Sequence, residues 1–466
     1  MQSDTICALA TPAGGAIGIV RISGEKALDT VSRIFSKDLR EASPNTVHHG
    51  YIVSAAGETI DEVLVSVFRA PNSYTGEDSA EISCHGSRYI LNNVLELLVA
   101  NGCRTANPGE YTMRAYLNGK LDLSQAEAVA DLIASTNKAT HQMAMGQLRG
   151  HFSSELSLLR NQLLKLTSLL ELELDFSEHE DLEFADRTEL SALAETIDAR
   201  ITSLSHSFEI GQAIRQGIPV AIVGKTNAGK STLLNRLIHD ERAIVSDIHG
   251  TTRDTIEDFI DINGVTFRLI DTAGLRHTTD TIEQIGIQRT YAVIDKAHVI
   301  LWLIDTILTD GEVKDILERC DGKSVVIVQT KSDLSANGDD KQAKSDEWQY
   351  LLQRHPTLHS IPVIPISAKT GHNIGTLEQA IYNAANLPTL TESDVIVSNA
   401  RHYHSLLAAH ENIQRVLSGI DGNLSGDLVA EDLRLVLSDL AEITGEGQIT
   451  PQETLNNIFS QFCIGK

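Results

Sequence analysis

The chain has 466 residues, of which 42% are hydrophobic and 22% are charged, and its formal net charge is −25. This composition is typical of a globular protein, and the length predicts about three domains, each with its own core. The negative charge argues against binding of nucleic acid over the whole surface, while a local basic groove stays open.

Three features predict a cytoplasmic protein. No apolar run reaches the roughly 18 residues that a membrane-spanning helix needs. Residues 1–15 lack the basic and apolar regions of a signal peptide. The cysteines are scattered and form no C-x-x-C pair, as expected in a reducing compartment; they are Cys7, Cys84, Cys103, Cys320 and Cys463.

Residues 1–120 are predicted to form an α+β domain, because apolar residues recur there with strand and then helix periodicity. The expected elements are strands at 17–22, 60–68 and 80–83 and helices at 26–34 and 88–100. The polar, glycine-bearing stretches at 72–78 and 84–86 are more typical of turns than of sites. The residues of this segment alone predict a fold and no chemistry.

Residues 121–215 are predicted to form the first part of a helical domain. Leucines spaced 3, 4, 3 and 4 residues apart give one helix an apolar seam; they are Leu156, Leu159, Leu163, Leu166 and Leu170. The acidic stretch 177–181 is expected to end this helix, and another helix is expected at about 189–210. The seam is expected to be core and not a ligand site.

Residues 216–386 carry the first chemical motif, PVAIVGKTNAGKST at 219–232. The frame G-x-x-x-x-G-K-S begins at Gly224, and its glycines allow a loop whose N–H groups face phosphate oxygens at a helix N-terminus. Lys230 is expected to reach the β- and γ-phosphates, and Ser231 to bind Mg²⁺. The other nucleotide contacts predicted in this loop are Asn227, Ala228, Gly229 and Thr232.

Further motifs follow in the order expected for a G protein. GTTR at 250–253 supplies Thr252, which is expected to close over Mg²⁺ when a γ-phosphate is bound. After a strand at 265–270, Asp271 is expected to hold Mg²⁺ through water, and Gly274 to sense the γ-phosphate. The remaining phosphate-side contacts predicted here are Thr272 and Ala273.

Alternating strands and helices predict a doubly wound sheet that binds its ligand at the carboxyl ends of the strands. The expected buried strands are 220–223, 265–270, 299–304, 325–328 and 361–366. The last of them leads into the predicted nucleotide contacts Ser367, Ala368 and Lys369.

The motif TKSD at 330–333 predicts guanine specificity, with Lys331 as a further nucleotide contact. Guanine offers two adjacent N–H donors that Asp333 can accept, whereas adenine has no such pair, so ATP would leave a carboxylate unpaired. GTP is therefore the expected nucleotide. Thr330 stands where the usual motif has Asn. Its hydroxyl can make one hydrogen bond but cannot bridge two groups as an amide does. The replacement is therefore expected to weaken nucleotide binding without changing the specificity for guanine.

Catalysis is predicted to differ from that of common small GTPases, which place a water-orienting Gln after D-x-x-G. This chain has Leu275 there, and an apolar side chain cannot orient water. Asn227 is expected to help hold a monovalent cation beside the phosphates. Glu283 is a candidate for polarising the attacking water, with a solvated carboxylate on a helix surface as an equally weighted alternative.

Residues 387–466 return to helical patterns and end in FCIGK. The expected helices are 401–417, 429–443 and 454–462. Because the nucleotide cassette lies between two helical stretches, the simplest architecture is one discontinuous helical domain with an inserted Ras-like P-loop GTPase domain. The predicted domains are 1–120, 121–215 with 387–466, and 216–386.

Along its full length the chain resembles the MnmE (TrmE) family of tRNA-uridine-modifying GTPases. The matching pieces are ATPAGGAIGIVRISG, NSYTGEDSAEISCHG, NPGEYTMRAYLNGKLDLSQAEAVADLI, SDIHGTTRD, DTAGLR with IEQIGIQR, SNARH and the terminal FCIGK. The terminal pentapeptide combined with an inserted G domain is the most specific part, because related ribosome-assembly GTPases share the G motifs and not these ends.

The resemblance implies a homodimer formed through the N-terminal domain, which binds a tetrahydrofolate derivative (the 5,10-methylene or 5-formyl form). It implies folate contacts at Arg21, Glu81, Lys120 and Lys466. It also implies K⁺-dependent meeting of the G domains, with Glu283 as the catalytic carboxylate and a functional role for Cys463. The implied K⁺ positions are Asn227, Ser246, Ile248 and Thr251; Ser246 and Thr251 are also implied nucleotide contacts.

The resemblance further implies a complex with the flavoprotein MnmG (GidA), a heterotetramer or larger, with FAD and NADH on that partner. Together they would build an aminomethyl or carboxymethylaminomethyl group on C5 of the wobble uridine of tRNA. Two alternatives stay open: a ribosome-assembly GTPase switch without group transfer, and a structural dimerising GTPase. The first is disfavoured because such proteins usually carry a basic RNA-binding tail, and this C-terminal segment is acidic and helical.

Overall fold

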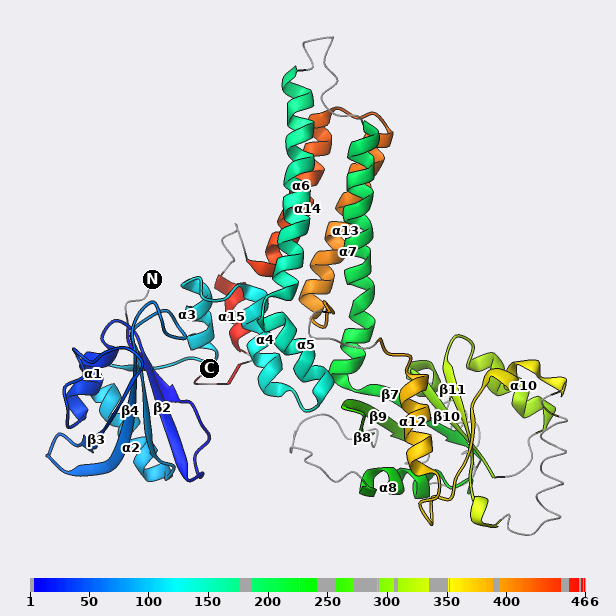
Figure 1. The fold of residues 1–466 in the computed structure, drawn as a ribbon, viewed down its shortest axis with the longest axis horizontal. Helices are drawn as coiled ribbons and strands as arrows, with labels where there is room; N and C mark the ends of the chain where they lie inside the picture. The colour runs from blue at the N-terminus through cyan, green and yellow to red at the C-terminus, as the bar shows by residue number, and fades with distance from the viewer. Residues whose placement is uncertain are drawn as a thin grey trace. The chain divides into compact units, whose positions relative to one another are not determined.

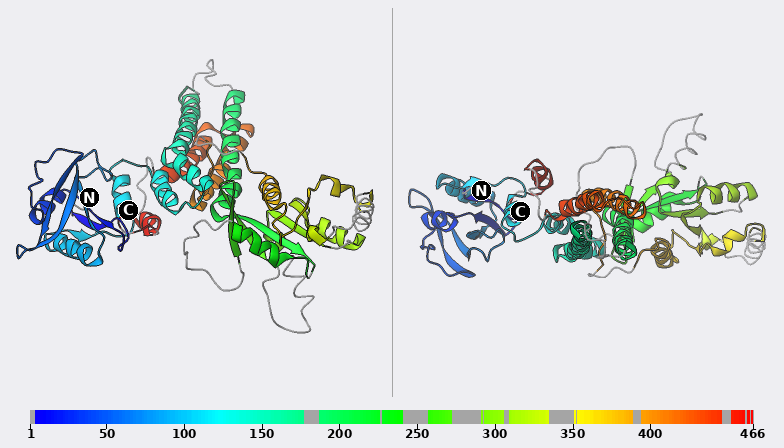
Figure 2. Two further views of the ribbon diagram at one scale, coloured as in Figure 1. Left: turned by 60° about the horizontal axis from the view of Figure 1, so that its bottom comes forward. Right: turned by 90° about the horizontal axis from the view of Figure 1, so that it is seen from above.

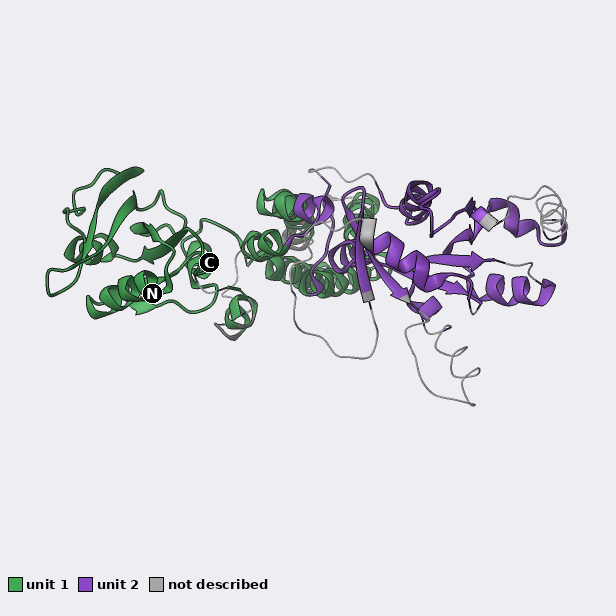
Figure 3. Cartoon of the chain, turned by 90° about the horizontal axis from the view of Figure 1, so that it is seen from below, with its two compact units in different colours: residues 1–134, 144–205, 401–466 green, residues 135–143, 206–400 purple. Residues whose placement is uncertain are grey.

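The computed structural model describes residues 4–176, 187–225, 227–240, 257–271, 291, 293–305, 309–334, 351, 353–388, 394–445, 452–460, 462–463 and 465. The chain divides into two compact units, coloured separately in Figure 3. Unit 1 comprises residues 1–134, 144–205 and 401–466, and unit 2 comprises residues 135–143 and 206–400. Among the described residues, no helix is both long and apolar enough to cross a bilayer.

Unit 1 begins with a six-stranded sheet in the order β3-β4-β5-β2-β1-β6. The strands are β1 (Ile6–Leu9), β2 (Ile17–Ser23), β3 (Thr46–Val53), β4 (Thr59–Phe68), β5 (Ser79–His85) and β6 (Arg104–Thr105). All neighbouring strands are antiparallel except β1 and β6. Helices α1 (Ala27–Ile34) and α2 (Arg88–Ala100) cover one face, which buries the core. The predicted strands and helices are confirmed, and β1, β3 and β6 are additional. The expected turn at 84–86 is wrong, because Cys84 and His85 belong to β5 and pair with β2.

The rest of unit 1 is helical (Figures 1 and 2). Its helices are α3 (Glu110–Leu117), α4 (Leu123–Ala134), α6 (His151–Phe176), α13 (Ala400–Asp421), α14 (Gly426–Thr444) and α15 (Gln452–Ser460). Helices α5 (Lys138–Leu148) and α7 (Arg187–Gln216) continue from one unit into the other. The leucine seam of α6 is buried from Leu156 to Leu170, so its prediction as core is confirmed.

Unit 2 is built on a sheet in the order β12-β11-β10-β7-β9-β8 (Figure 1). The strands are β7 (Ile218–Gly224), β8 (Glu257–Ile262), β9 (Val265–Asp271), β10 (Val299–Ile304), β11 (Ser324–Gln329) and β12 (Val363–Pro365). They are parallel except β8, which runs antiparallel to β9. The last strand is shorter than the predicted 361–366.

Both faces of this sheet are buried, which explains the continuous apolar runs of its strands. On one face the strands pack with α8 (Lys230–Asp240) and α12 (Ile374–Ala384). On the other face they pack with α10 (Asp310–Arg319) and the turn η2 (Pro356–Ser360). The predicted doubly wound fold is confirmed, and its motifs follow the carboxyl ends of the strands.

Candidate functional sites

The glycine loop joins β7 to the N-terminus of α8, as a phosphate-binding loop requires. Gly224 has no room for a side chain, because a Cβ there would lie 2.7 Å from the carbonyl oxygen of Leu303. Gly229 has a φ of +95° and Asn227 a φ of +66°, so both adopt the left-handed conformation that curls the loop.

Lys230 lies across this loop. Its Nζ donates to the carbonyl oxygens of Gly224 at 2.6 Å and Lys225 at 2.9 Å. Ser231 and Thr232 follow in the first turn of α8, where exposed hydroxyls and the positive end of the helix favour anions and their bound cations. Asp271, the last residue of β9, is in register with Ile222 of β7, which brings its backbone beside this loop.

The base-recognition segment is fastened to the phosphate loop by Thr330. Its Oγ1 donates to the carbonyl oxygen of Ala228 at 2.8 Å, and the carbonyl oxygen of Ile304 lies 3.5 Å from the same hydroxyl. Lys331 has a φ of +57°, and its Nζ forms an ion pair with Asp305 at 2.7 Å. Asp333 follows in the exposed turn η1 (Ser332–Leu334).

The segment at 367–369 lies beside the base-recognition turn. The N–H of Ser332 donates to the carbonyl oxygen of Ile366 at 3.0 Å, and the N–H of Ile366 donates to Gln329 at 2.7 Å. Buried Ser367 accepts from the N–H of Thr370 at 3.3 Å, which shapes the turn. The structure therefore brings the phosphate loop, 330–333 and 367–369 to one edge of the sheet.

The predicted residues of the switch segments lie outside the described residues. They are Ser246, Ile248, Thr251, Thr252, Thr272, Ala273, Gly274 and Glu283, together with Leu275 and the C-terminal Lys466.

A second cluster of predicted residues lies on the first sheet of unit 1. Arg21 on β2 and Glu81 on β5 are directly opposite in register. Arg21 donates from Nε to Glu81 Oε1 at 2.9 Å, and its Nη2 lies 2.7 Å from the same oxygen. The guanidinium also lies 5.7 Å and 5.6 Å from the ring centres of Tyr74 and Tyr111. This arrangement combines an oriented carboxylate, a cation and two aromatic rings.

Both tyrosines are held by hydrogen bonds. Tyr111 Oη donates to the carbonyl oxygen of Arg21 at 2.8 Å, and Tyr74 Oη lies 2.9 Å from Thr112 Oγ1. Burial raises the pKa of Tyr74 and of Tyr111, so both rings stay neutral near pH 7. Neither tyrosine was predicted as a site residue from the sequence, although the stretches NSYTGED and NPGEYT contain them.

The first turn of α3, which carries Tyr111, is fixed by two ion pairs to the buried carboxylate of Glu110. Glu110 is 2% exposed and accepts from Arg104 at 2.6 Å and from Arg114 at 2.9 Å. Burial would raise the pKa of Glu110, but hydrogen bonds from both guanidinium groups lower it overall. The Glu110 carboxylate therefore stays ionised near pH 7.

Lys120 closes the loop that presents Tyr74. Its Nζ donates to the carbonyl oxygen of Pro71 at 3.0 Å, and Asn118 Nδ2 donates to that of Thr75 at 2.7 Å. The stretch 72–78 is thus a turn, as its glycine and polar residues indicated. It also brings Tyr74 to Arg21.

The C-terminal segment also reaches this cluster. Arg21 Nη1 donates to the carbonyl oxygen of Gly465 at 3.2 Å, and the N–H of Gly109 donates to that of Cys463 at 3.4 Å. Gly465 has a φ of +95°, and a Cβ there would lie 2.0 Å from the carbonyl oxygen of Leu9. Only glycine fits this approach. Cys463 itself is exposed.

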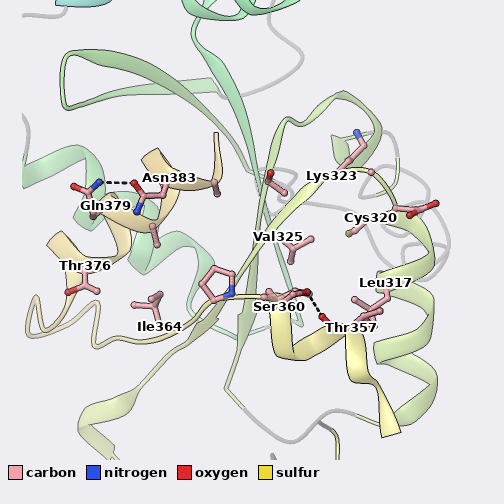
Figure 4. A pocket seen from close by; sticks show the side chains of 17 residues that line it. Leu317, Cys320, Lys323, Val325, Thr357, Ser360, Ile364, Thr376, Gln379 and Asn383 are labelled. Carbon is pink, nitrogen blue, oxygen red and sulfur yellow. Dashed lines mark hydrogen bonds between the residues drawn. The ribbon is translucent and has the colours of Figure 1, made fainter. Parts of the chain in front are cut away.

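A cavity of about 820 Å³ lies at the opposite edge of the unit 2 sheet from the nucleotide motifs (Figure 4). It is lined by Ser324 at the start of β11, by Pro362 before β12, and by Gln379 and Asn383 of α12. Because the nucleotide motifs follow the carboxyl ends of the strands, this cavity is separate from the phosphate site.

The doubly wound sheet and the glycine loop at the N-terminus of α8 define a P-loop GTPase. A family model described as the MnmE helical domain matches residues 123–463, and one described as the GTP-binding protein TrmE N-terminus matches residues 5–120. The chain belongs to the MnmE (TrmE) family.

Curated relatives agree along the full length. A tRNA modification GTPase MnmE of Phocaeicola vulgatus is 53% identical and covers 100% of this chain and 99% of the relative. Those of Bacteroides thetaiotaomicron and Flavobacterium johnsoniae are 52% and 48% identical, and each covers 100% of both chains. The chain is therefore a tRNA modification GTPase that uses GTP with Mg²⁺.

Proposed function

We propose that this GTPase is the nucleotide-hydrolysing subunit of a complex that modifies C5 of the wobble uridine of tRNA in the cytoplasm. The flavoprotein MnmG (GidA) would be its partner and would carry FAD and NADH. The added aminomethyl or carboxymethylaminomethyl group would take one carbon from a tetrahydrofolate derivative. The observation that carries this proposal is the Arg21–Glu81 pair between two tyrosines.

This cluster fits a folate. The two contacts of Arg21 with Glu81 are both made to Oε1, so Oε2 faces no donor in that pair and can accept from the paired N–H edge of a pterin. The rings of Tyr74 and Tyr111 suit an aromatic ligand. Arg21 and Lys120 supply positive charge for an anionic tail, and we assign Lys466 and Cys463 to the same site because the Gly465 carbonyl contacts Arg21. Bound folate would supply the transferable carbon.

The phosphate loop fits the proposed hydrolysis. Ser231 at the start of α8 would hold Mg²⁺ together with Thr252, and Lys230 would contact the β- and γ-phosphates. Asn227, part of this loop, would offer its side-chain oxygen to K⁺, and Ser246, Ile248 and Thr251 would complete the site. Glu283 would orient the attacking water.

A homodimer through the N-terminal domain is supported by the sheet face that α1 and α2 leave uncovered. Large apolar side chains are exposed on three of its strands: Ile17 on β2, Val47 and Tyr51 on β3, and Leu64 on β4. Apolar residues on one sheet face suit burial against a second copy. Such a dimer would also let two G domains meet across it during hydrolysis.

We also propose the domain boundaries 1–120, 121–215, 216–386 and 387–466. The match of the TrmE N-terminus model to residues 5–120 supports the first boundary. The grouping of residues 144–205 with 401–466 supports one discontinuous helical domain.

Calorimetry with 5-formyltetrahydrofolate and the full-length protein tests the proposal. The wild type is expected to bind, and Glu81→Gln to lose most of the affinity, because an amide cannot accept two N–H bonds at one edge. Glu96→Gln, exposed on α2 and therefore on the other side of the sheet, is the control and should bind as the wild type does. A wild type that releases no heat and retains no folate would favour the ribosome-assembly switch or the structural GTPase.

A further inference from the structure

A polar groove of about 490 Å³ in unit 1 belongs to none of the sites above. Its lining residues come from the turn between α5 and α6, the first turns of α6 and the start of α4. These three helices are labelled in Figure 1. Its lining residues are Gln125, Arg149, Gly150, Ser153, Ser154, Ser157, Leu158 and Asn161. Hydroxyl, amide and guanidinium groups predominate, and this lining contains no carboxylate.

Hydrogen bonds between the groove's lining residues and the neighbouring helices fix the shape of the groove. Gln125 Nε2 donates to the carbonyl oxygen of Leu148 at 3.0 Å, and Ser153 Oγ lies 3.0 Å from Ser124 Oγ on α4. Gly150 has a φ of +83°, and a Cβ there would lie 3.1 Å from Gln125 Nε2, so glycine makes the tight turn between the helices. This turn leads directly into the first turn of α6.

The local charge is opposite to that of the whole chain. Residues 144–170, the part of unit 1 that carries most of the lining, contain three basic residues and one acidic residue, a net charge of +2, whereas the chain carries −25. The single acid, Glu155, forms an ion pair with Arg200 of α7 and does not line the groove. Lys165 is exposed and lies eleven residues after Ser154, which places both on one side of α6.

We propose that this groove binds the phosphate–sugar backbone of the tRNA substrate. Proteins contact nucleic-acid backbones with Arg and Lys, with Ser, Asn and Gln side chains, and with helix N-termini. This groove combines Arg149, several Ser side chains, Asn161 and Gln125 with the N-terminus of α6, and Lys165 lies farther along the same side of that helix. Contacts to the backbone and the 2′-hydroxyl groups position an RNA without reading its sequence. The inference rests on the proposed action on tRNA and names the surface that holds the substrate.

Binding of a fluorescent, unmodified tRNA transcript to the full-length protein tests this assignment. We expect Arg149→Gln to weaken binding several-fold and to reduce the slope of log Kd against log salt by about one, the loss of one phosphate contact. Ser154→Asp places a negative charge in the groove and should weaken binding further. Acidic residues stabilise the first turn of a helix, so this variant is expected to fold.

Arg160→Gln is the matched control, because Arg160 is exposed on the same helix and does not line the groove. It should leave Kd within about twofold of the wild type, and GTP hydrolysis should be unchanged in all three variants. If both groove variants keep the wild-type affinity and salt slope, the assignment of the groove is overturned and the proposed function is not affected. Equal weakening in the control would also overturn it. A wild type that binds no tRNA at low salt would contradict both the groove and the proposed function.

Discussion

Replacement of Glu127 by Gln tests how the helical part of unit 1 is held together. The Glu127 carboxylate on α4 accepts from His402 Nε2 at 2.6 Å and from Arg401 at 3.0 Å and 2.9 Å. Arg401 also donates to the carbonyl oxygens of Glu442 at 2.7 Å and Ile443 at 3.0 Å, near the end of α14. One buried carboxylate therefore connects α4 with α13 and, through Arg401, with α14.

The pKa of Glu127 indicates how much its ionised carboxylate contributes to the free energy of unfolding. Burial alone would raise this pKa, but the charge and hydrogen bond of His402, together with Arg401, lower it from the usual 4.5 to about 2. A lowering of this size corresponds to about 3 kcal/mol. Because the pKa is lower in the folded state, this stabilisation is present above pH 4.5 and is lost as the pH falls towards 2.

Glu127→Gln should therefore lower the free energy of unfolding by about 3 kcal/mol at pH 7, since it leaves Arg401 and buried His402 without the carboxylate that both contact. Urea unfolding followed by circular dichroism measures this loss, and the gap to the wild type should narrow below pH 4.5. Glu155→Gln, which breaks a more exposed ion pair with Arg200, is the control and should cost less than about 1 kcal/mol. A loss for Glu127→Gln no larger than that of the control would refute the reasoning.

Three further predictions concern the proposed sites. GTP hydrolysis should be much faster in KCl than in NaCl. Equal rates would contradict the proposal that Asn227 helps to hold K⁺. Glu283→Ala should nearly abolish GTP turnover while nucleotide binding, measured by fluorescence, is retained. An unchanged kcat would favour the alternative that Glu283 is a solvated surface carboxylate without a catalytic role. Gly465→Ala should displace the C-terminal segment, because its Cβ would lie 2.0 Å from the Leu9 carbonyl oxygen. Folate affinity should then fall with GTP hydrolysis unaffected, and unchanged calorimetry would argue against a role of this segment.

Local sequence patterns predicted the parts of the fold that depend on periodicity. The leucine seam of α6 and the strands of unit 2 are long, regular runs, so their burial follows from spacing alone. The shorter strands were harder to predict. β6 has two residues, and β3 contains the sequence HHG, which weakens its strand pattern. Their pairing is decided by neighbouring strands and not by their own residues.

The sites formed by consecutive residues could also be predicted from the sequence, whereas contacts between residues far apart in the chain could not. The glycine loop and Thr330 can be recognised from the sequence because each belongs to a short motif of consecutive residues; in the structure Thr330 Oγ1 donates to the carbonyl oxygen of Ala228. The contact between Arg21 and Gly465 joins residues 444 positions apart, and no local pattern predicts such a pairing. The Glu127–His402 pair, 275 positions apart, went unpredicted for the same reason.

Analysis of wobble uridines by mass spectrometry tests the central claim most directly. A strain lacking this chain should lose the aminomethyl-type modification at C5, and the wild-type gene should restore it. Glu81→Gln should fail to restore it although the variant still hydrolyses GTP, because folate binding and nucleotide hydrolysis use separate sites. Normal wobble uridines in the deletion strain, or full restoration by Glu81→Gln, would contradict the account.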